Sequence, residues 1–172
     1  MLCKTSYNIK FKKLSFKTMF TYFIIGEGSY MEILEMKISN YEEVFKLWTS
    51  TAGMGMRNLD DSKEGISKFL KRNPTTNFIA VDNGKIVGVI LCGHDGRRAY
   101  IYHTAVYKEY RGKGIGKRLV DKVMDALKHE GINKAALVVF NSNEIGNAFW
   151  SSIGWEKRED LNYYNLSLNN EN

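Results

Sequence analysis

A glycine-rich segment flanked by basic side chains is the part of the sequence best suited to bind an anion. It reads Tyr110-Arg111-Gly112-Lys113-Gly114-Ile115-Gly116-Lys117-Arg118-Leu119-Val120, and apolar residues then recur at helical spacing. Glycine lets the backbone approach a ligand closely, and the first N–H groups of a helix carry partial positive charge without an internal partner. Four basic side chains add charge there. The segment therefore predicts a phosphate or pyrophosphate site at the start of a helix.

The spacing of these glycines excludes two common nucleotide-binding loops. A P-loop needs Gly, four residues and then Gly-Lys-Ser/Thr, but counting back from Gly116 puts Arg111 where the first glycine belongs. A dinucleotide loop needs Gly-x-Gly-x-x-Gly, and counting from Gly112 puts Lys117 at the third glycine. The spacing that fits is Arg-x-x-Gly-x-Gly, with Arg111, Gly114 and Gly116. This pattern resembles the pyrophosphate loop of the GNAT superfamily of acyl-CoA-dependent N-acyltransferases.

A second motif strengthens the resemblance. The segment from Asn143 to Trp155 reads Asn-Glu-Ile-Gly-Asn-Ala-Phe-Trp-Ser-Ser-Ile-Gly-Trp, which is similar in order and spacing to the family's Asn-x-x-x-x-x-Phe-Tyr-x-x-x-Gly-Phe segment. The resemblance covers roughly Met31 to Leu168 and is specific for the superfamily rather than for any substrate.

The resemblance implies acetyl-CoA as the acyl donor and assigns residues to its binding. In the family the pantetheine arm lies between two splayed parallel strands and bonds to the backbone of the first strand. By alignment that backbone is here Thr104, Ala105 and Val106, and Asn143 takes the place of an asparagine that bonds the arm. The pyrophosphate would lie on Arg111, Gly112, Lys113, Gly114, Ile115, Gly116 and Lys117.

The implied reaction is direct attack of an amine on a thioester, which requires a base and an oxyanion donor. The donor is most simply a backbone N–H near Ala105 or Val106. The family often places a Glu on the first splayed strand, but the sequence there is Tyr102-His103-Thr104, without a carboxylate. His103 is a candidate base, because imidazole exchanges protons near neutral pH. Two alternatives stay open: a structural histidine, and a relay through water.

Trp150 occupies the position at which many relatives carry the tyrosine taken to protonate the departing thiolate. An indole donates a hydrogen bond but does not release its proton. Either Trp150 packs against the donor while another group acts, or the protein binds acyl-CoA with little turnover. Tyr163 and Tyr164 are candidate substitutes for the missing acid.

Hydrophobic periodicity predicts the elements that position these residues. The expected strands are Met31–Lys37, Phe78–Val81, Lys85–Cys92, Ala99–Val106, Ala135–Phe140, Trp155–Lys157 and Tyr163–Leu168. The expected helices follow Asn40, Asp61 or Ser62, and the glycine loop, and the last spans Glu144–Ser152. Asn83-Gly84 predicts a type I′ hairpin, and Asp95-Gly96 a second one.

This order predicts an α+β fold. A mixed, mostly antiparallel sheet carries helices on both faces, and the glycine-loop helix connects two parallel strands. In the GNAT fold this central parallel pair is splayed. The segment between the first two helices would roof the acceptor site with Trp48, Met54, Met56, Arg57, Asp60 and Asp61. Asp60 or Asp61 could hold a cationic amine, although each is also a typical helix cap.

Composition places few limits on the partners. The formal net charge is +6, and residues 1–30 contribute +4 of it through five lysines and one glutamate. The remainder lacks the basic face with interleaved aromatics that is typical of nucleic-acid binding. No apolar run approaches the roughly 18 residues that span a membrane. The two cysteines, Cys3 and Cys92, have no metal-ligand spacing, so we expect no metal and reduced thiols in a cytoplasmic protein.

We therefore expect residues 31–172 to form an acetyl-CoA-dependent N-acetyltransferase domain, preceded by an extension, residues 1–30, of unassigned role. Within the extension, Phe20–Ile25 could add an edge strand or contact a neighbouring subunit, so a homodimer stays open. The expected acceptor is a small-molecule amine or a peptide N-terminus. The alternative function is an acyl-CoA-binding or sensing module with little turnover.

Overall fold

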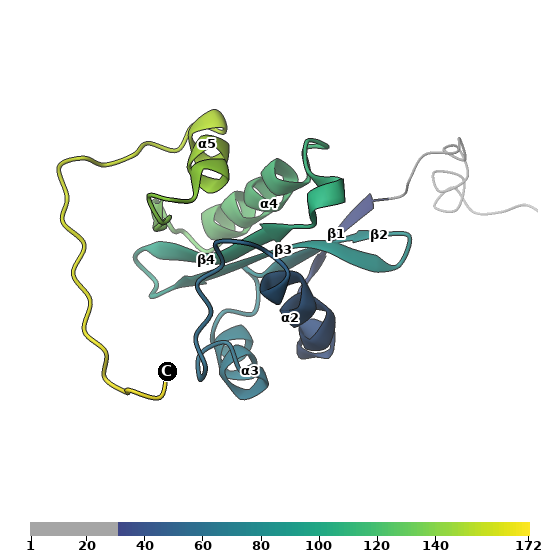
Figure 1. Ribbon diagram of the computed structural model, residues 1–172, viewed down its shortest axis with the longest axis horizontal. Coiled ribbons are helices and arrows are strands. Elements are labelled where there is room, and N and C mark those ends of the chain that lie inside the picture. Colours follow the sequence, from purple (N-terminus) through teal and green to yellow (C-terminus); the bar gives the residue numbers. More distant parts are fainter. Residues whose placement is uncertain (1–30) are drawn as a thin grey trace, which may run out of the picture.

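The computed structural model describes residues 31–172 and contains a five-stranded sheet (Figure 1). Its three middle strands, β2, β3 and β4, are apolar segments. The strand order is β1-β2-β3-β4-β5, and only the β4–β5 pair is parallel. The strands are β1 (Met31–Glu35), β2 (Phe78–Asp82), β3 (Lys85–His94), β4 (Ala99–Val106) and β5 (Ala135–Ala136). The helices are α2 (Tyr41–Thr49), α3 (Lys63–Arg72), α4 (Ile115–His129) and α5 (Glu144–Ser152), with short 3₁₀ turns η1 (Ile38–Asn40) and η2 (Lys108–Tyr110).

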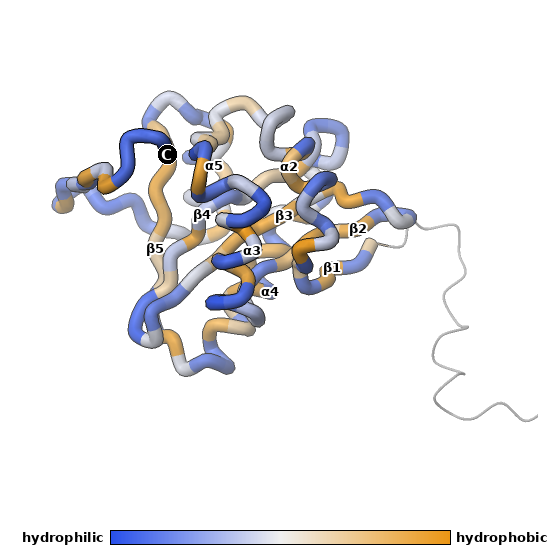
Figure 2. The backbone as a smooth tube through the Cα atoms, turned by 90° about the horizontal axis from the view of Figure 1, so that it is seen from below, coloured by the Kyte–Doolittle hydropathy of each residue, from blue (hydrophilic) through white to orange (hydrophobic). Residues whose placement is uncertain are grey.

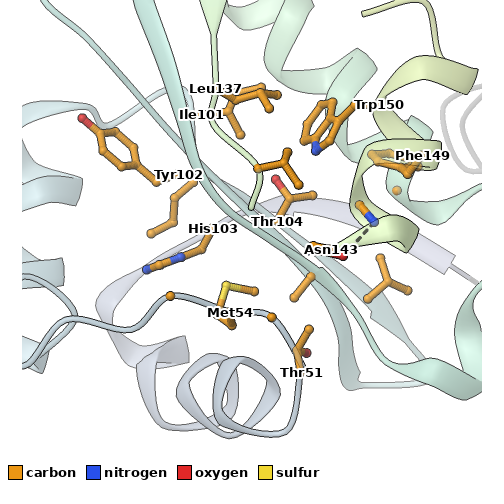
Figure 3. A pocket seen from close by; sticks show the side chains of 18 of the residues that line it. Thr51, Met54, Ile101, Tyr102, His103, Thr104, Leu137, Asn143, Phe149 and Trp150 are labelled. Carbon is orange, nitrogen blue, oxygen red and sulfur yellow. Dashed lines mark hydrogen bonds between the residues drawn. The ribbon is translucent and has the colours of Figure 1, made fainter. Parts of the chain in front are cut away.

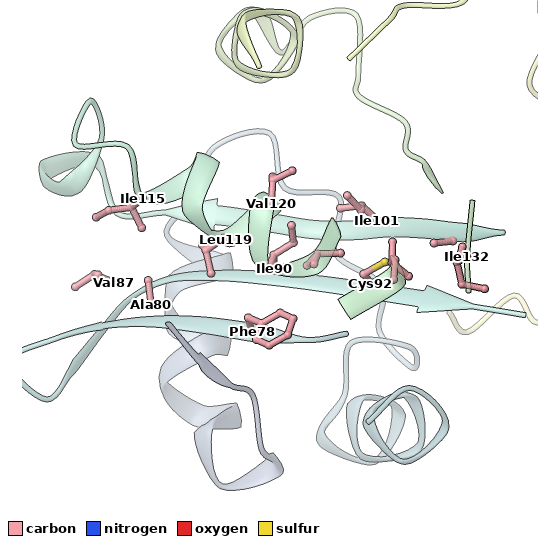
Figure 4. Packing of buried hydrophobic residues seen from close by; sticks show 13 residues of the cluster. Phe78, Ala80, Val87, Ile90, Cys92, Ile101, Ile115, Leu119, Val120 and Ile132 are labelled. Atoms are coloured by element: carbon pink, nitrogen blue, oxygen red, sulfur yellow. The ribbon is translucent and has the colours of Figure 1, made fainter. Parts of the chain in front are cut away.

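Both faces of the sheet are covered, which confirms the expected α+β fold. α4 and α5 lie on one face, and α2 and α3 on the other (Figure 1). Hydropathy is highest along the central strands, while turns and outer helix faces are hydrophilic (Figure 2). In Figure 4, Ile90 and Cys92 of β3 and Ile101 of β4 meet Leu119 and Val120 of α4. A second cluster, which includes Val44, Leu47 and Trp48 of α2, fills the opposite face.

Local signals set several boundaries as predicted. Asn83 and Gly84 have φ angles of +48° and +80°, so the type I′ hairpin between β2 and β3 is confirmed. Ser62 caps α3, because its side chain accepts a hydrogen bond from Gly65 N at 3.1 Å. The second hairpin differs from the prediction. Gly96 has a positive φ but Asp95 does not, and the Asp95 carboxylate instead accepts hydrogen bonds from the N–H groups of Arg97 and Arg98.

Three predicted strands at the C-terminal end are wrong in part or in whole. The strand expected at Ala135–Phe140 ends at Ala136, and Trp155–Lys157 and Tyr163–Leu168 form no strand. The chain after α5 instead runs along the outside and returns towards α3, where Asn172 accepts hydrogen bonds from the N–H groups of Leu59 and Asp60 (Figure 1). Strand propensity reflects the fit to a half-buried sheet. Without a neighbouring strand, the apolar side chains of 163–168 stay exposed.

Some sequence-based expectations fall outside the described residues. Phe20–Ile25 and Cys3 lie in residues 1–30, and the domain boundary at Met31 stays a prediction. Cys92 is buried and free. Among residues 31–172 no helix has the length and apolarity needed to cross a bilayer.

Candidate active site

The glycine loop leads into α4 with an exposed set of backbone donors. Gly112 and Gly114 have φ angles of +75° and +76°, where L side chains are strained, and a Cβ on either would meet nothing within 4 Å. The first intrahelical bond runs from Arg118 N to Gly114 O at 3.0 Å. The N–H groups of Ile115, Gly116 and Lys117 precede this bond, so they have no helical partner. Open space and unpaired donors together form a cradle that fits a phosphate group.

The basic side chains around this cradle differ in where they point. Arg111 lines the cavity and donates from Nε to Val106 O at 3.0 Å, which ties the loop to the end of β4. Lys117 also lines it and pairs with Asp121 at 2.7 Å. Lys113 and Arg118 do not line it. The Lys113 ammonium lies 4.8 Å from the centre of the Tyr110 ring, and Arg118 donates to Met31 O.

Gly116 has a packing role that the motif alone did not reveal. A Cβ at this position would lie 3.0 Å from the Phe149 ring of α5. The third glycine of the motif therefore lets α5 pack against the first turn of α4, and this contact carries Trp150 to the cavity.

The chain leaves β4 directly after the two residues of β5, which confirms the expected splay. Ala99 and Tyr100 pair with Ala135 and Ala136, and beyond them residues 137–140 diverge from β4 and line the cavity. On the β4 side of this gap, the Thr104 hydroxyl oxygen is buried and has no partner within residues 31–172. In Figure 3, Thr104 lies on the side of β4 that faces Leu137 and Trp150.

The N–H of Val106 also points into this gap. Tyr107 N donates to Val87 O across the sheet, and hydrogen-bonding directions alternate from residue to residue along a strand. The backbone of Val106 therefore faces away from β3, in agreement with the bond from Arg111 to its carbonyl oxygen. Of the two oxyanion donors expected from the sequence, the geometry favours Val106.

A bulge in β4 brings His103 to the other side of the sheet. Thr104 pairs with Ile90 and Ile101 with Cys92, so Leu91 alone opposes both Tyr102 and His103. As a result these consecutive side chains share a face (Figure 3). Tyr102 meets the Phe69 ring of α3 edge-on at 5.4 Å, and His103 lies 4.9 Å from the Trp48 ring of α2.

His103 has a partner that sequence reasoning did not assign to it. Its Nε2 lies 2.6 Å from Oδ1 of Asp61, which is 5% exposed. Because Ser62 is the cap of α3, the Asp61 side chain is left for other contacts. No local signal links the two residues, which are 42 positions apart.

The part of the cavity near His103 combines aromatic and charged groups. Met54, Arg57, Asp60 and Asp61 of the predicted roof line it, whereas Trp48 and Met56 pack in the core. Lys68, Phe69 and Arg72 of α3 and Tyr100 and Tyr102 of β4 were missed as a group because they come from distant segments, whereas Tyr163, also in the lining, was named as a candidate acid. Burial raises the pKa of Tyr100 to about 12 and also raises that of Tyr102, so both hydroxyls stay protonated at neutral pH.

α5 supplies the remaining wall. Trp150 meets Phe149 and Trp155 edge-on, each at 5.0 Å between ring centres, and faces the gap in Figure 3. Asn143 caps the helix, since its Oδ1 accepts from Gly146 N at 2.9 Å, and its Nδ2 stays next to the cavity. Tyr163 lines the cavity, whereas Tyr164 does not and is 86% exposed.

These parts enclose one continuous cavity of about 1260 Å³. It extends from the cradle at α4, through the gap beside β4, to the pair formed by His103 and Asp61. A long ligand with a phosphate end can lie along the gap and present its other end to a second molecule near His103.

Comparison with known proteins agrees with this geometry. A model of the acetyltransferase (GNAT) family matches residues 41–155. Among curated proteins, Acetyltransferase SG1711 of Sodalis glossinidius (strain morsitans) is 28% identical over 131 residues, which cover 76% of this chain and 91% of that protein.

Solved structures show the same fold. PaiA N-acetyltransferase from Thermoplasma acidophilum, solved in complex with coenzyme A, superposes with a TM-score of 0.67 at 22% identity, over 77% of this chain and 93% of that chain. An acetyltransferase of the GNAT family from Staphylococcus aureus Mu50 gives a TM-score of 0.65 at 25% identity, over 77% of this chain and 90% of that chain.

Proposed function

The chain belongs to the GNAT acetyltransferase family, and we propose that it transfers the acetyl group of acetyl-CoA to the primary amine of a small molecule or a peptide N-terminus. The observation that carries this proposal is the single cavity that joins the phosphate cradle, the gap beside β4 and the His103 side chain. His103 and Thr104 are consecutive in β4, whereas the opposite wall of the gap, residues 137–140, comes from a distant segment.

The residues present fit acetyl-CoA as the acyl donor. The left-handed Gly112 and Gly114 leave space for the pyrophosphate, and the N–H groups of Ile115, Gly116 and Lys117 are its donors. The Thr104 hydroxyl and Nδ2 of Asn143 are available to the pantetheine arm within the gap. The donor supplies an activated thioester carbonyl, and the remaining tasks belong to the protein.

The first task is to remove a proton from the acceptor. A lysine-like amine has a pKa of about 10.4 and arrives as ammonium. We assign its deprotonation to Nδ1 of His103, because Nε2 is bonded to Asp61. The neutral amine then attacks the thioester carbonyl and forms the N–C bond. The resulting oxyanion collapses with loss of the C–S bond, and the second nitrogen proton ends on the departing thiolate.

The other tasks are charge stabilisation and departure of the thiol. The Val106 N–H points into the gap, where it can donate to the oxyanion. Trp150 is a wall of the donor site and not an acid, since indole keeps its proton. A thiol has a pKa of about 8.5, so the thiolate is a tolerable leaving group without an acid.

Thiol release from acetyl-CoA with a panel of amines tests the proposal, and mass spectrometry of the acceptor identifies the product. We expect release that depends on an amine and an acceptor that gains one acetyl group. Tight binding of acetyl-CoA without acceptor-dependent release across small amines and peptide N-termini would contradict the proposal and favour a binding module.

A further inference from the structure

His103 and Asp61 form a closely held pair at the acceptor end of the cavity. The Nε2–Oδ1 distance is 2.6 Å, and the side chains are 14% and 6% exposed. The centres of the Trp48 ring and the imidazole ring lie 4.9 Å apart, so Trp48 limits the rotation of the imidazole. Within residues 31–172, no group hydrogen-bonds to Nδ1 of His103. One ring nitrogen is therefore committed to the carboxylate, and the other is left for a substrate.

The Asp61 carboxylate is fixed independently of His103. Its Oδ2 accepts a hydrogen bond from Arg57 N at 2.6 Å. Asp61 N donates to Arg57 O at 3.2 Å, and the Tyr41 hydroxyl donates to Asp61 O at 2.9 Å. The loop that carries Asp61 also lies so close to α3 that a Cβ on Gly65 would collide with the carbonyl oxygens of the loop. A carboxylate held in this fixed position can determine which ring nitrogen of His103 carries the proton.

We propose that Asp61 is a positioning residue that holds neutral His103 with its proton on Nε2, so that Nδ1 is the basic nitrogen facing the acceptor amine. The carboxylate also stabilises the imidazolium that forms when Nδ1 takes a proton from the ammonium group. Water removes this proton from the imidazolium afterwards. The inference rests on the proposed function, in which His103 is the base.

The contacts of Asp61 make Asp61→Asn a specific probe. Arg57 N is a donor, so the amide oxygen of the new side chain must face it. The amide nitrogen then faces His103 and donates to Nε2, which forces the imidazole proton onto Nδ1. The size of the side chain hardly changes, but the nitrogen that faces the amine no longer has a lone pair.

The tautomer can be measured without any turnover, by long-range ¹H–¹⁵N correlation of the histidine rings at a pH high enough for the rings to be neutral. The chain has three histidines, and His103→Ala identifies the signal of interest. We expect the Nε2–H form in the wild type and the Nδ1–H form in Asp61→Asn. The Nδ1–H form in the wild type, or the same form in both proteins, would overturn the proposal.

Kinetics then show whether Asp61 acts through His103. We expect Asp61→Asn to lower kcat/KM by about 10²–10⁴-fold in the wild type, the range seen when a base is lost or held in the wrong tautomer, and to have no further effect in His103→Ala. Glu64→Gln is the matched control. It removes the same charge three residues away, at an exposed side chain of α3 that does not line the cavity, and should change kcat/KM by less than about threefold.

If Asp61→Asn and His103→Ala lower kcat/KM by factors that multiply in the double variant, Asp61 acts independently of His103, and the proposal is overturned. Absence of transfer by the wild type would contradict the proposed function instead, while the tautomer measurement would still decide whether Asp61 orients His103.

Discussion

The phosphate cradle makes a quantitative prediction for Gly114, compared as Asp and as Asn. Both side chains tolerate the left-handed backbone at φ +76° better than most, and both enter space in which a Cβ has no neighbour within 4 Å. The two variants therefore share the same backbone strain and nearly the same shape. They differ in one negative charge placed where a phosphate should lie.

The magnitude of this difference follows from the Coulomb energy. Two unit charges 4 Å apart repel by about 4 kcal/mol at an effective dielectric constant of 20, and salt at a surface site reduces this value. We expect Gly114→Asp to bind acetyl-CoA with about 1–3 kcal/mol less free energy than Gly114→Asn, which is about 5- to 150-fold in Kd. Strain of about 1 kcal/mol should lower the Tm of both variants by about 2–4 °C.

Calorimetry with two ligands separates charge from shape. Acetyl-CoA should show the difference between Asp and Asn, whereas an acetylated pantetheine fragment without phosphates should not. Equal acetyl-CoA affinity for the two folded variants would refute the assignment of the cradle to phosphate. The same difference with the fragment would show that the side chains disturb the gap rather than the phosphate site.

Four further outcomes are expected. His103→Ala should lower kcat/KM by about 10²-fold or more without changing acetyl-CoA affinity, and an unchanged rate would make His103 structural. Gly65→Ala should displace the loop that carries Asp61, so kcat/KM and Tm should both fall; a variant that matches the wild type would contradict this packing. Burial raises the pKa of Cys92 to about 12, so thiol reagents at pH 8 should label it only after unfolding, and rapid labelling mapped to the peptide of Cys92, rather than to that of Cys3, in the folded protein would contradict its burial. Removal of residues 1–30 should leave acetyl-CoA affinity unchanged, and loss of binding would place them in the domain.

The features that sequence predicted well have local causes. Asn83-Gly84 forms the expected turn because both residues adopt a positive φ, and Ser62 caps α3 through a bond only three residues long. The start of α4 follows from the left-handed Gly114. Each of these depends on residues that are neighbours in the chain, so residue type and spacing were enough.

The features that sequence missed depend on distant partners. Tyr102 and His103 share a face of the sheet because of the bulge opposite Leu91, and the residue types in β4 do not predict this bulge. The pairing of Asp61 with His103 requires the loop before α3 and the strand β4 to be in place. At the C-terminal end, residues 163–168 have the residue types of a strand, but a strand also requires a neighbouring edge.

A crystal structure of the protein with acetyl-CoA tests the central claim most directly, because the claim is that one cavity holds both the donor and the base. The pyrophosphate should accept hydrogen bonds from the N–H groups of Ile115, Gly116 and Lys117, and the acetyl carbonyl should accept one from Val106, on the same side of the molecule as Nδ1 of His103. A donor whose pyrophosphate lies away from α4, or whose acetyl group is remote from both Val106 and His103, would contradict the account.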